Sequence, residues 1–148
     1  MKILIITIGK KHDDIIREGI EQYTKRIKNY LPIDWKVIPT SDPRTEGSKI
    51  LTTLLPGDFC LLLDDEGVNY SSEKLAELVN ERLGSSDKRL VFIIGGAYGF
   101  DKKVKEKGHI VWSLGKLTFP HQLVRLIVAE QIYRALTIIK GEGYHHAG

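Results

Sequence analysis

Cysteine is nearly absent from this chain of 148 residues, which carries only one, Cys60. A single cysteine cannot close a disulfide within the chain, so a reducing interior suits the protein better than secretion. Cys60 sits inside the apolar run FCLLL, where a small buried side chain is the expected role. The sequence therefore predicts a cytoplasmic protein whose fold depends on packing alone.

Long apolar runs, repeats and low-complexity tracts are missing as well. No stretch approaches the roughly 18 uninterrupted apolar residues that a membrane span needs. The apolar start, residues 1–8, has a single lysine and is too short to act as a signal peptide. Because the length suits one domain, we expect residues 1–148 to form a single domain without a membrane partner.

A strong excess of charge is also missing, since the net charge is only +3. This balance allows an anionic partner such as RNA without requiring one. The densest basic run either contacts phosphates or forms a solvated helix face, and it consists of Lys102, Lys103, Lys105 and Lys107. No metal is expected, because adjacent histidines rarely share one metal and the acidic run 64–66 is more typical of a solvated turn.

What the chain does contain is an alternation of short apolar runs with amphipathic segments of helix length. Strands are predicted at residues 2–8, 33–38, 59–63, 89–94 and 109–114. Helices are predicted at 13–30, at 73–83 after Ser71 or Ser72, and from Pro120 to 139. Residues 49–55 are predicted to form the last turns of a further short helix. The run 33–38 is the least apolar and is expected near a sheet edge. The pattern predicts an α/β fold with a mostly parallel sheet of about five strands.

The long helix after Pro120 is apolar around most of its circumference. Thr118 stands before it as a possible cap. A helix of this kind cannot expose a full side to water, so one face is covered either by the rest of the fold or by another subunit. In so short a chain the second alternative, a homodimer, is attractive.

Three of the predicted strands end in glycine-bearing turns. Leu63 leads into DDEG, Ile94 into GGAYGF and Leu114 into GKLTFP. Ligands of open parallel sheets bind beyond the carboxyl ends of the strands, and glycines there let backbone groups approach a small molecule. The GGAYGF spacing does not match the dinucleotide fingerprint, and no phosphate-cradling GxxxxGK[ST] motif is present. We therefore expect the three turns to form one pocket for a small ligand.

Several blocks together resemble a known family: KILIITIGK, LLLDDEG, IIGGAYGF, SLGKLTFPHQLVRLIVAEQIYRA and GEGYHH. The chain resembles the bacterial ribosomal RNA large-subunit methyltransferase H family, of the SPOUT class, over essentially its whole length. The resemblance implies an α/β domain with helices on both faces of the sheet and a C-terminal trefoil knot, acting as a homodimer. It also implies that S-adenosylmethionine is used to methylate N3 of a pseudouridine in 23S rRNA of the assembled ribosome.

By motif position, the resemblance also implies which residues hold the cofactor. Cofactor contacts are expected at Leu63, Gly95, Leu114, Gly115, Lys116, Leu117, Thr118 and Phe119. The imide N3 of a uracil-type base must lose its proton, and the candidates for this step are His121, Tyr144 and His145. RNA contacts are expected at Lys10, Lys11, Arg125, Arg134 and His146, with Lys102, Lys103 and Lys140 as further cations.

Two features depart from the family pattern. His146 stands where the family typically carries Arg or Lys, and Ala147 and Gly148 extend the tail. Because histidine is neutral at high pH, a phosphate contact at position 146 would be weakened there. The alternatives are a methyltransferase for another RNA such as tRNA or for a small molecule, and a non-enzymatic, ribosome-associated nucleotide-binding module.

Overall fold

The computed structural model describes residues 1–146 and contains one sheet of five strands in the order β2-β1-β4-β3-β5. All neighbouring strands run parallel. The strands are β1 (Lys2–Ile8), β2 (Ile33–Ile38), β3 (Asp58–Asn69), β4 (Arg89–Ile94) and β5 (Ile110–Ser113). The predicted α/β fold with a parallel sheet is confirmed, and β2 lies at the expected edge.

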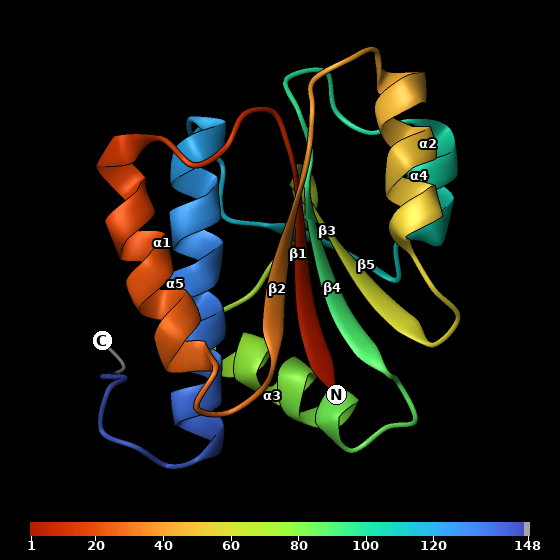
Figure 1. Ribbon diagram of the computed structural model, residues 1–148. Coiled ribbons are helices and arrows are strands. Elements are labelled where there is room, and N and C mark those ends of the chain that lie inside the picture. Colours follow the sequence, from red (N-terminus) through yellow and green to blue (C-terminus); the bar gives the residue numbers. More distant parts are fainter. Residues whose placement is uncertain (147–148) are drawn as a thin grey trace.

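Helices cover both faces of the sheet (Figure 1). On one face lie α1 (Asp14–Ile27), α3 (Ser72–Leu83) and α5 (His121–Ile139), and on the other α2 (Pro43–Thr53) and α4 (Lys102–Lys107). Each face has its own hydrophobic cluster. The near-continuous apolar run of β1 follows from this layering, because Ile3 and Ile5 belong to the first cluster while Leu4 and Ile6 belong to the second.

The helix α5 lies between α1 and α3 and packs on the sheet (Figure 1). Its most buried apolar residues are Val128, Ala129, Ile132, Ala135 and Leu136. The apolar circumference seen in the sequence is therefore largely covered within the chain. Toward the start of the helix, Leu123 keeps 37% of its surface exposed. Pro120 is the N-cap and no side chain caps the helix, so the expected capping role of Thr118 is wrong.

The strand β3 continues beyond its predicted end at Leu63 as far as Asn69. Between Leu63 and Val68 its register with β5 shifts, so a bulge separates the buried half from a polar, mostly exposed half. The prediction of an acidic loop directly after Leu63 was wrong, because exposed strand residues need not be apolar.

The helix α2 begins at Pro43, well before the segment predicted from the sequence. Asp42 caps it by accepting a hydrogen bond from the Thr45 N–H at 2.9 Å, and proline occupies the first helical turn. Glu46 and Gly47 are buried in this helix although they read as loop residues.

No helix within residues 1–146 is long and apolar enough to cross a membrane. The trefoil knot implied by the resemblance stays a prediction. The extension Ala147–Gly148 lies outside the described residues.

Candidate active site

A cavity of about 320 Å³ opens beyond the carboxyl ends of the central strands. Its walls come from three separate parts of the chain. They are residues 63–65 of β3, residues 94–100 after β4, and residues from Trp112 to Val124 around the start of α5. Two of the predicted glycine-bearing turns, those after β4 and β5, therefore line one pocket, while the third wall is the strand β3 and not a turn.

Glycines give this pocket its shape at two positions. At Gly95 a Cβ atom would lie 3.0 Å from the ring of Phe100, so only glycine lets the ring approach this closely. Gly115 has a φ of +133°, a backbone conformation that L-residues rarely adopt. The Ser113 hydroxyl holds this turn by accepting from the Gly115 N–H at 3.1 Å and donating to the Gly115 carbonyl at 3.0 Å.

The chemistry of the lining suits a nucleoside-like cofactor with a cationic part. Apolar side chains such as Ile94, Phe100 and Trp112 provide surfaces for a flat ring. Asp64 and Asp65 line the same cavity and bring negative charge to it, which favours a positively charged group there. S-adenosylmethionine combines an adenine ring with a sulfonium and an ammonium group, so the residues present fit it.

Most of the residues expected to contact the cofactor lie at the cavity. The lining includes Leu63, Gly95, Leu114, Gly115, Leu117, Thr118 and Phe119. Lys116 belongs to the same loop, but its side chain is exposed and does not line the cavity. Of the candidate proton-handling residues, only His121 lines it.

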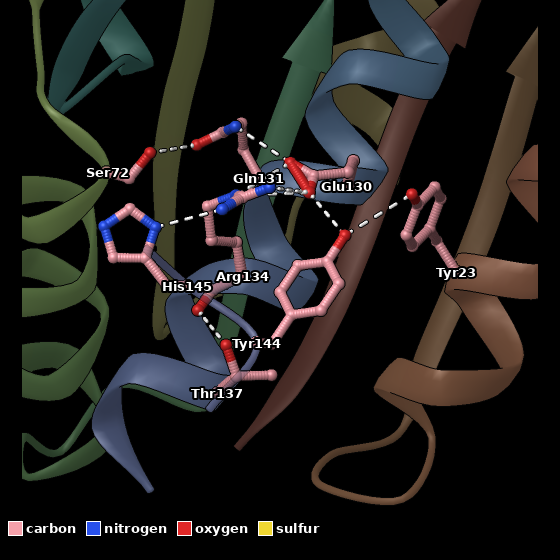
Figure 2. Close-up of polar contacts among 8 residues, drawn as sticks. All are labelled: Tyr23, Ser72, Glu130, Gln131, Arg134, Thr137, Tyr144 and His145. Atoms are coloured by element: carbon pink, nitrogen blue, oxygen red, sulfur yellow. Dashed lines mark hydrogen bonds and ion pairs between the residues drawn. The ribbon is translucent and has the colours of Figure 1, made fainter. Parts of the chain in front are cut away.

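Tyr144 and His145 lie elsewhere, in a polar cluster along the C-terminal half of α5 (Figure 2). The Tyr144 hydroxyl donates to Glu130 Oε2 at 2.9 Å and lies 3.5 Å from the Tyr23 hydroxyl. His145 Nδ1 lies 3.0 Å from Arg134 Nη1, and its Nε2 lies 2.7 Å from Glu73 Oε1. We call Glu130, Arg134, Tyr144 and His145 the tail cluster.

Burial and the hydrogen bonds with Tyr23 and Glu130 raise the pKa of Tyr144 well above its ordinary value. The hydroxyl of Tyr144 therefore stays protonated at neutral pH and acts as a donor. Arg134 and Glu130 form a three-bond ion pair one helical turn apart, with Nη2 and Oε2 3.0 Å apart. Sequence reasoning missed Glu130, although an acid four residues before an arginine in an otherwise apolar helix was the available signal.

Arg125 was expected to contact RNA, and the structure corrects this. Its residue is only 1% exposed. Its guanidinium donates to the carbonyls of Lys10 at 2.8 Å and Ile8 at 3.2 Å, and lies 3.3 Å from His12 Nδ1. A side chain buried in this way fixes the β1–α1 loop and is not free to meet a phosphate.

The other residues expected at RNA differ in accessibility. Lys10, Lys11, Lys140 and His146 are exposed, whereas Arg134 is partly buried in the tail cluster. Within residues 1–146, no group of three or more His, Cys, Asp or Glu side chains is arranged to hold a metal ion.

The parallel sheet, its two helical layers and the pocket beyond its strand ends define an α/β protein with a site for a small ligand. Residues 1–145 match the family described as "Predicted SPOUT methyltransferase", and the chain belongs to this family.

Among its relatives is the ribosomal RNA large subunit methyltransferase H of Parabacteroides distasonis, which is 40% identical, with 99% of each chain covered. The protein of the same name in Cytophaga hutchinsonii is 41% identical, with 99% of this chain and 100% of the relative covered. The protein of the same name in Bacteroides fragilis is 40% identical to this chain, with 99% of each chain covered.

A solved structure, that of a probable methylase family protein from Haemophilus influenzae Rd KW20, is similar to this chain with a TM-score of 0.56. The match covers 98% of this chain and 70% of that chain at 10% sequence identity. At this identity, the likeness concerns the fold alone.

Proposed function

We propose that the protein is a cytoplasmic, S-adenosylmethionine-dependent methyltransferase that modifies N3 of a pseudouridine in 23S rRNA of the assembled ribosome. The observation that carries this proposal is the cavity formed by three distant segments in a chain of this family. The full-length similarity to ribosomal RNA large subunit methyltransferases supports the choice of RNA.

In the proposed site, the residues around Leu63, Gly95 and Leu114–Phe119 hold the cofactor, whose sulfonium supplies the methyl group when bound. The apolar walls exclude water, and the glycine turns bring backbone groups close to the ligand. Much of the acceleration of a methyl transfer comes from holding the acceptor in line with the donor. The protein needs no metal for this chemistry.

The acceptor N3 is protonated at neutral pH, so the site must remove a proton or stabilise the anion that remains. His121 borders the cavity and is the candidate base. The protonated Tyr144 and the Arg134 guanidinium are donors suited to stabilising an anionic base. We include His145 as a second candidate for moving the proton.

Because Tyr144 and His145 do not line the cavity of their own chain, their proposed roles require a second subunit, so we propose a homodimer. In the proposed dimer the tail cluster of one subunit lies near the cavity of the other. Such a site would be complete only in the dimer.

The direct test is mass spectrometry of rRNA nucleosides after ribosomes lacking the modification are incubated with the protein and isotope-labelled cofactor. We expect one labelled methylpseudouridine in 23S rRNA. Free rRNA and tRNA are incubated in parallel, and label found only in one of these would favour the alternative substrate. Absence of heat on titration with S-adenosylmethionine would contradict an enzymatic role.

Replacing the proposed proton-handling residues should separate chemistry from binding. We expect His121→Ala and Tyr144→Phe to lower kcat about 10²-fold or more, because general acid–base groups contribute on that order. The dissociation constant of S-adenosylmethionine, measured by calorimetry, should change little. An equal loss in both quantities would contradict the catalytic assignment.

A further inference from the structure

The helix α4 concentrates more positive charge than any other element of comparable length. Its sequence is KKVKEK, with four lysines among six residues. Val104 is fully buried against the cluster on this face of the sheet and anchors the helix. All four lysines are exposed, and together we call Lys102, Lys103, Lys105 and Lys107 the α4 basic surface.

None of these lysines takes part in an ion pair within the described part of the chain. On the opposite face of the sheet, by contrast, α1 contains the pair Arg17–Asp14 and α3 contains Lys74–Glu77. Two acids of the neighbouring α2 are already hydrogen-bonded within their own segment. Asp42 caps α2, and the buried carboxylate of Glu46 accepts from the Ser41 N–H at 2.8 Å. Two acids lie next to the lysines: Glu106 on α4 itself is exposed, and Asp101, the N-cap residue of α4, is half-buried and its side chain caps no N–H.

The arrangement works against the stability of α4. Lys102 and Lys103 occupy its first turn, where the positive end of the helix dipole repels cations. Lys103 and Lys107 are four residues apart, a spacing at which like charges repel across one helical turn. Since neither feature helps the helix to form, the lysines are better explained by an anionic ligand than by folding.

The position of α4 connects it to the cavity. Phe100 lines the cavity and also packs against the cluster beneath α2 and α4, and α4 begins two residues later. Figure 1 shows α2 and α4 side by side on this face. The neighbouring α2 adds two exposed cations, Arg44 and Lys49. An extended anion bound along α4 would therefore lie beside the cavity.

We propose that the α4 basic surface binds the phosphate backbone of the substrate RNA and holds it next to the cavity. This inference rests on the proposed function, because it assumes that the target base enters that cavity. Phosphate contacts carry no sequence information, so the role of α4 is to position the RNA while other groups select the base.

The test compares two variants that lose the same charge. Lys103→Gln/Lys107→Gln changes one side of α4, and Lys25→Gln/Lys28→Gln changes exposed lysines of the opposite face at the end of α1. Glutamine keeps a helix propensity close to that of lysine, so both variants should fold. The measurement is kcat and KM for ribosomes lacking the modification, over roughly 50–200 mM KCl, the range in which phosphate contacts respond strongly.

We expect the α4 variant to raise KM without changing kcat or the affinity for S-adenosylmethionine. The slope of log KM against log salt should fall by about one for each lysine that contacts a phosphate. The α1 variant should keep the native slope, and Lys103→Arg/Lys107→Arg should keep it too. An unchanged slope in the α4 variant, or an equal change in the α1 variant, would overturn the proposal.

A second measurement separates this inference from the proposed function. Fluorescence anisotropy with a labelled RNA hairpin requires no methyl transfer, so it reports on α4 even if the native protein proves inactive on ribosomes. Binding that weakens only in the α4 variant supports the RNA surface. Equal binding of the hairpin by all variants would overturn it. So would a protein that sediments with phosphatidylserine vesicles through its α4 lysines and does not bind the hairpin.

Discussion

Arg125 is among the largest fully buried side chains of the protein, and the β1–α1 loop depends on it. It donates to two carbonyls of that loop region, those of Ile8 and Lys10. Burial and the charge of Arg125 lower the pKa of His12, so this imidazole is neutral at physiological pH and able to accept from the guanidinium. A single side chain thus fixes how the exposed Lys10 and Lys11 are presented.

Replacing Arg125 should therefore destabilise the fold. We expect Arg125→Met to lower the free energy of unfolding by about 2–3 kcal/mol, because buried acceptors lose a charged donor. Urea denaturation followed by circular dichroism measures this change. Lys74→Met removes the solvent-exposed ion pair with Glu77 on α3, far from this loop, and should cost less than about 1 kcal/mol. Equal losses in the two variants would contradict the structural role of Arg125.

Cys60 should make stability depend on pH in the alkaline range. Burial raises the pKa of its thiol to about 11, whereas an unfolded thiol ionises near about 8.5. The contribution of the Cys60 thiol to the free energy of unfolding is fully present below the pKa of the unfolded state. It is lost as pH rises through the pKa of the folded state. Between pH ~8 and ~10, the free energy of unfolding of the native protein should fall by about 2 kcal/mol more than that of the Cys60→Ala variant. Parallel pH profiles for the two proteins would show that the thiol is not desolvated.

At the scale of elements, the turn between β5 and α5 depends on the backbone conformation of Gly115. No atom lies within 4 Å of a Cβ placed there, so an added methyl group would strain the backbone without colliding with a neighbour. Gly115→Ala should shift the turn and weaken S-adenosylmethionine binding about tenfold or more, roughly 1.4 kcal/mol. Calorimetry measures this affinity. Gly143→Ala, in the tail and without a left-handed φ, is the matched control, and equal affinities in both variants would contradict the prediction.

The sequence predicted those elements whose residues are buried on a regular period. The strands β1 and β4 were predicted with their observed limits because both faces of each are covered, which produces continuous apolar runs. The extension of β3 was missed because its second half is polar and exposed. Polar residues also hid the start of α2, although Asp42 followed by Pro43 is a recognisable helix start.

The candidate site was predictable in its backbone and less so in its side chains. Glycine turns after buried strands indicate where a pocket forms, and the turns after β4 and β5 do line the cavity, whereas the predicted turn after Leu63 is part of β3. The environment of a charged side chain depends on which elements meet around it, which spacing along the chain does not reveal. For this reason the burial of Arg125 and the pairing of Glu130 with Arg134 emerged only from the three-dimensional arrangement.

At the scale of the whole molecule, the proposed dimer makes a testable claim about the start of α5. Leu117 and Leu123 remain exposed there beside the cavity, at 73% and 37%. We expect the native protein to sediment as a dimer at micromolar concentration and Leu123→Glu to sediment as a folded monomer with little activity, because a carboxylate would be buried in the interface. Lys25→Glu, on exposed α1 surface, is the control. A native monomer with full methyl transfer would contradict the dimeric site.

The three walls of the pocket follow one another along the chain. The first comes from β3, the second follows β4, and the third ends at Val124. During translation, the site for a methyl donor therefore stays incomplete until residue 124 has been synthesised. Products truncated before residue 112 lack this third wall entirely, so their site for the donor is incomplete. The ligand in turn favours completed chains, because anything that binds only the folded state shifts the folding equilibrium toward it.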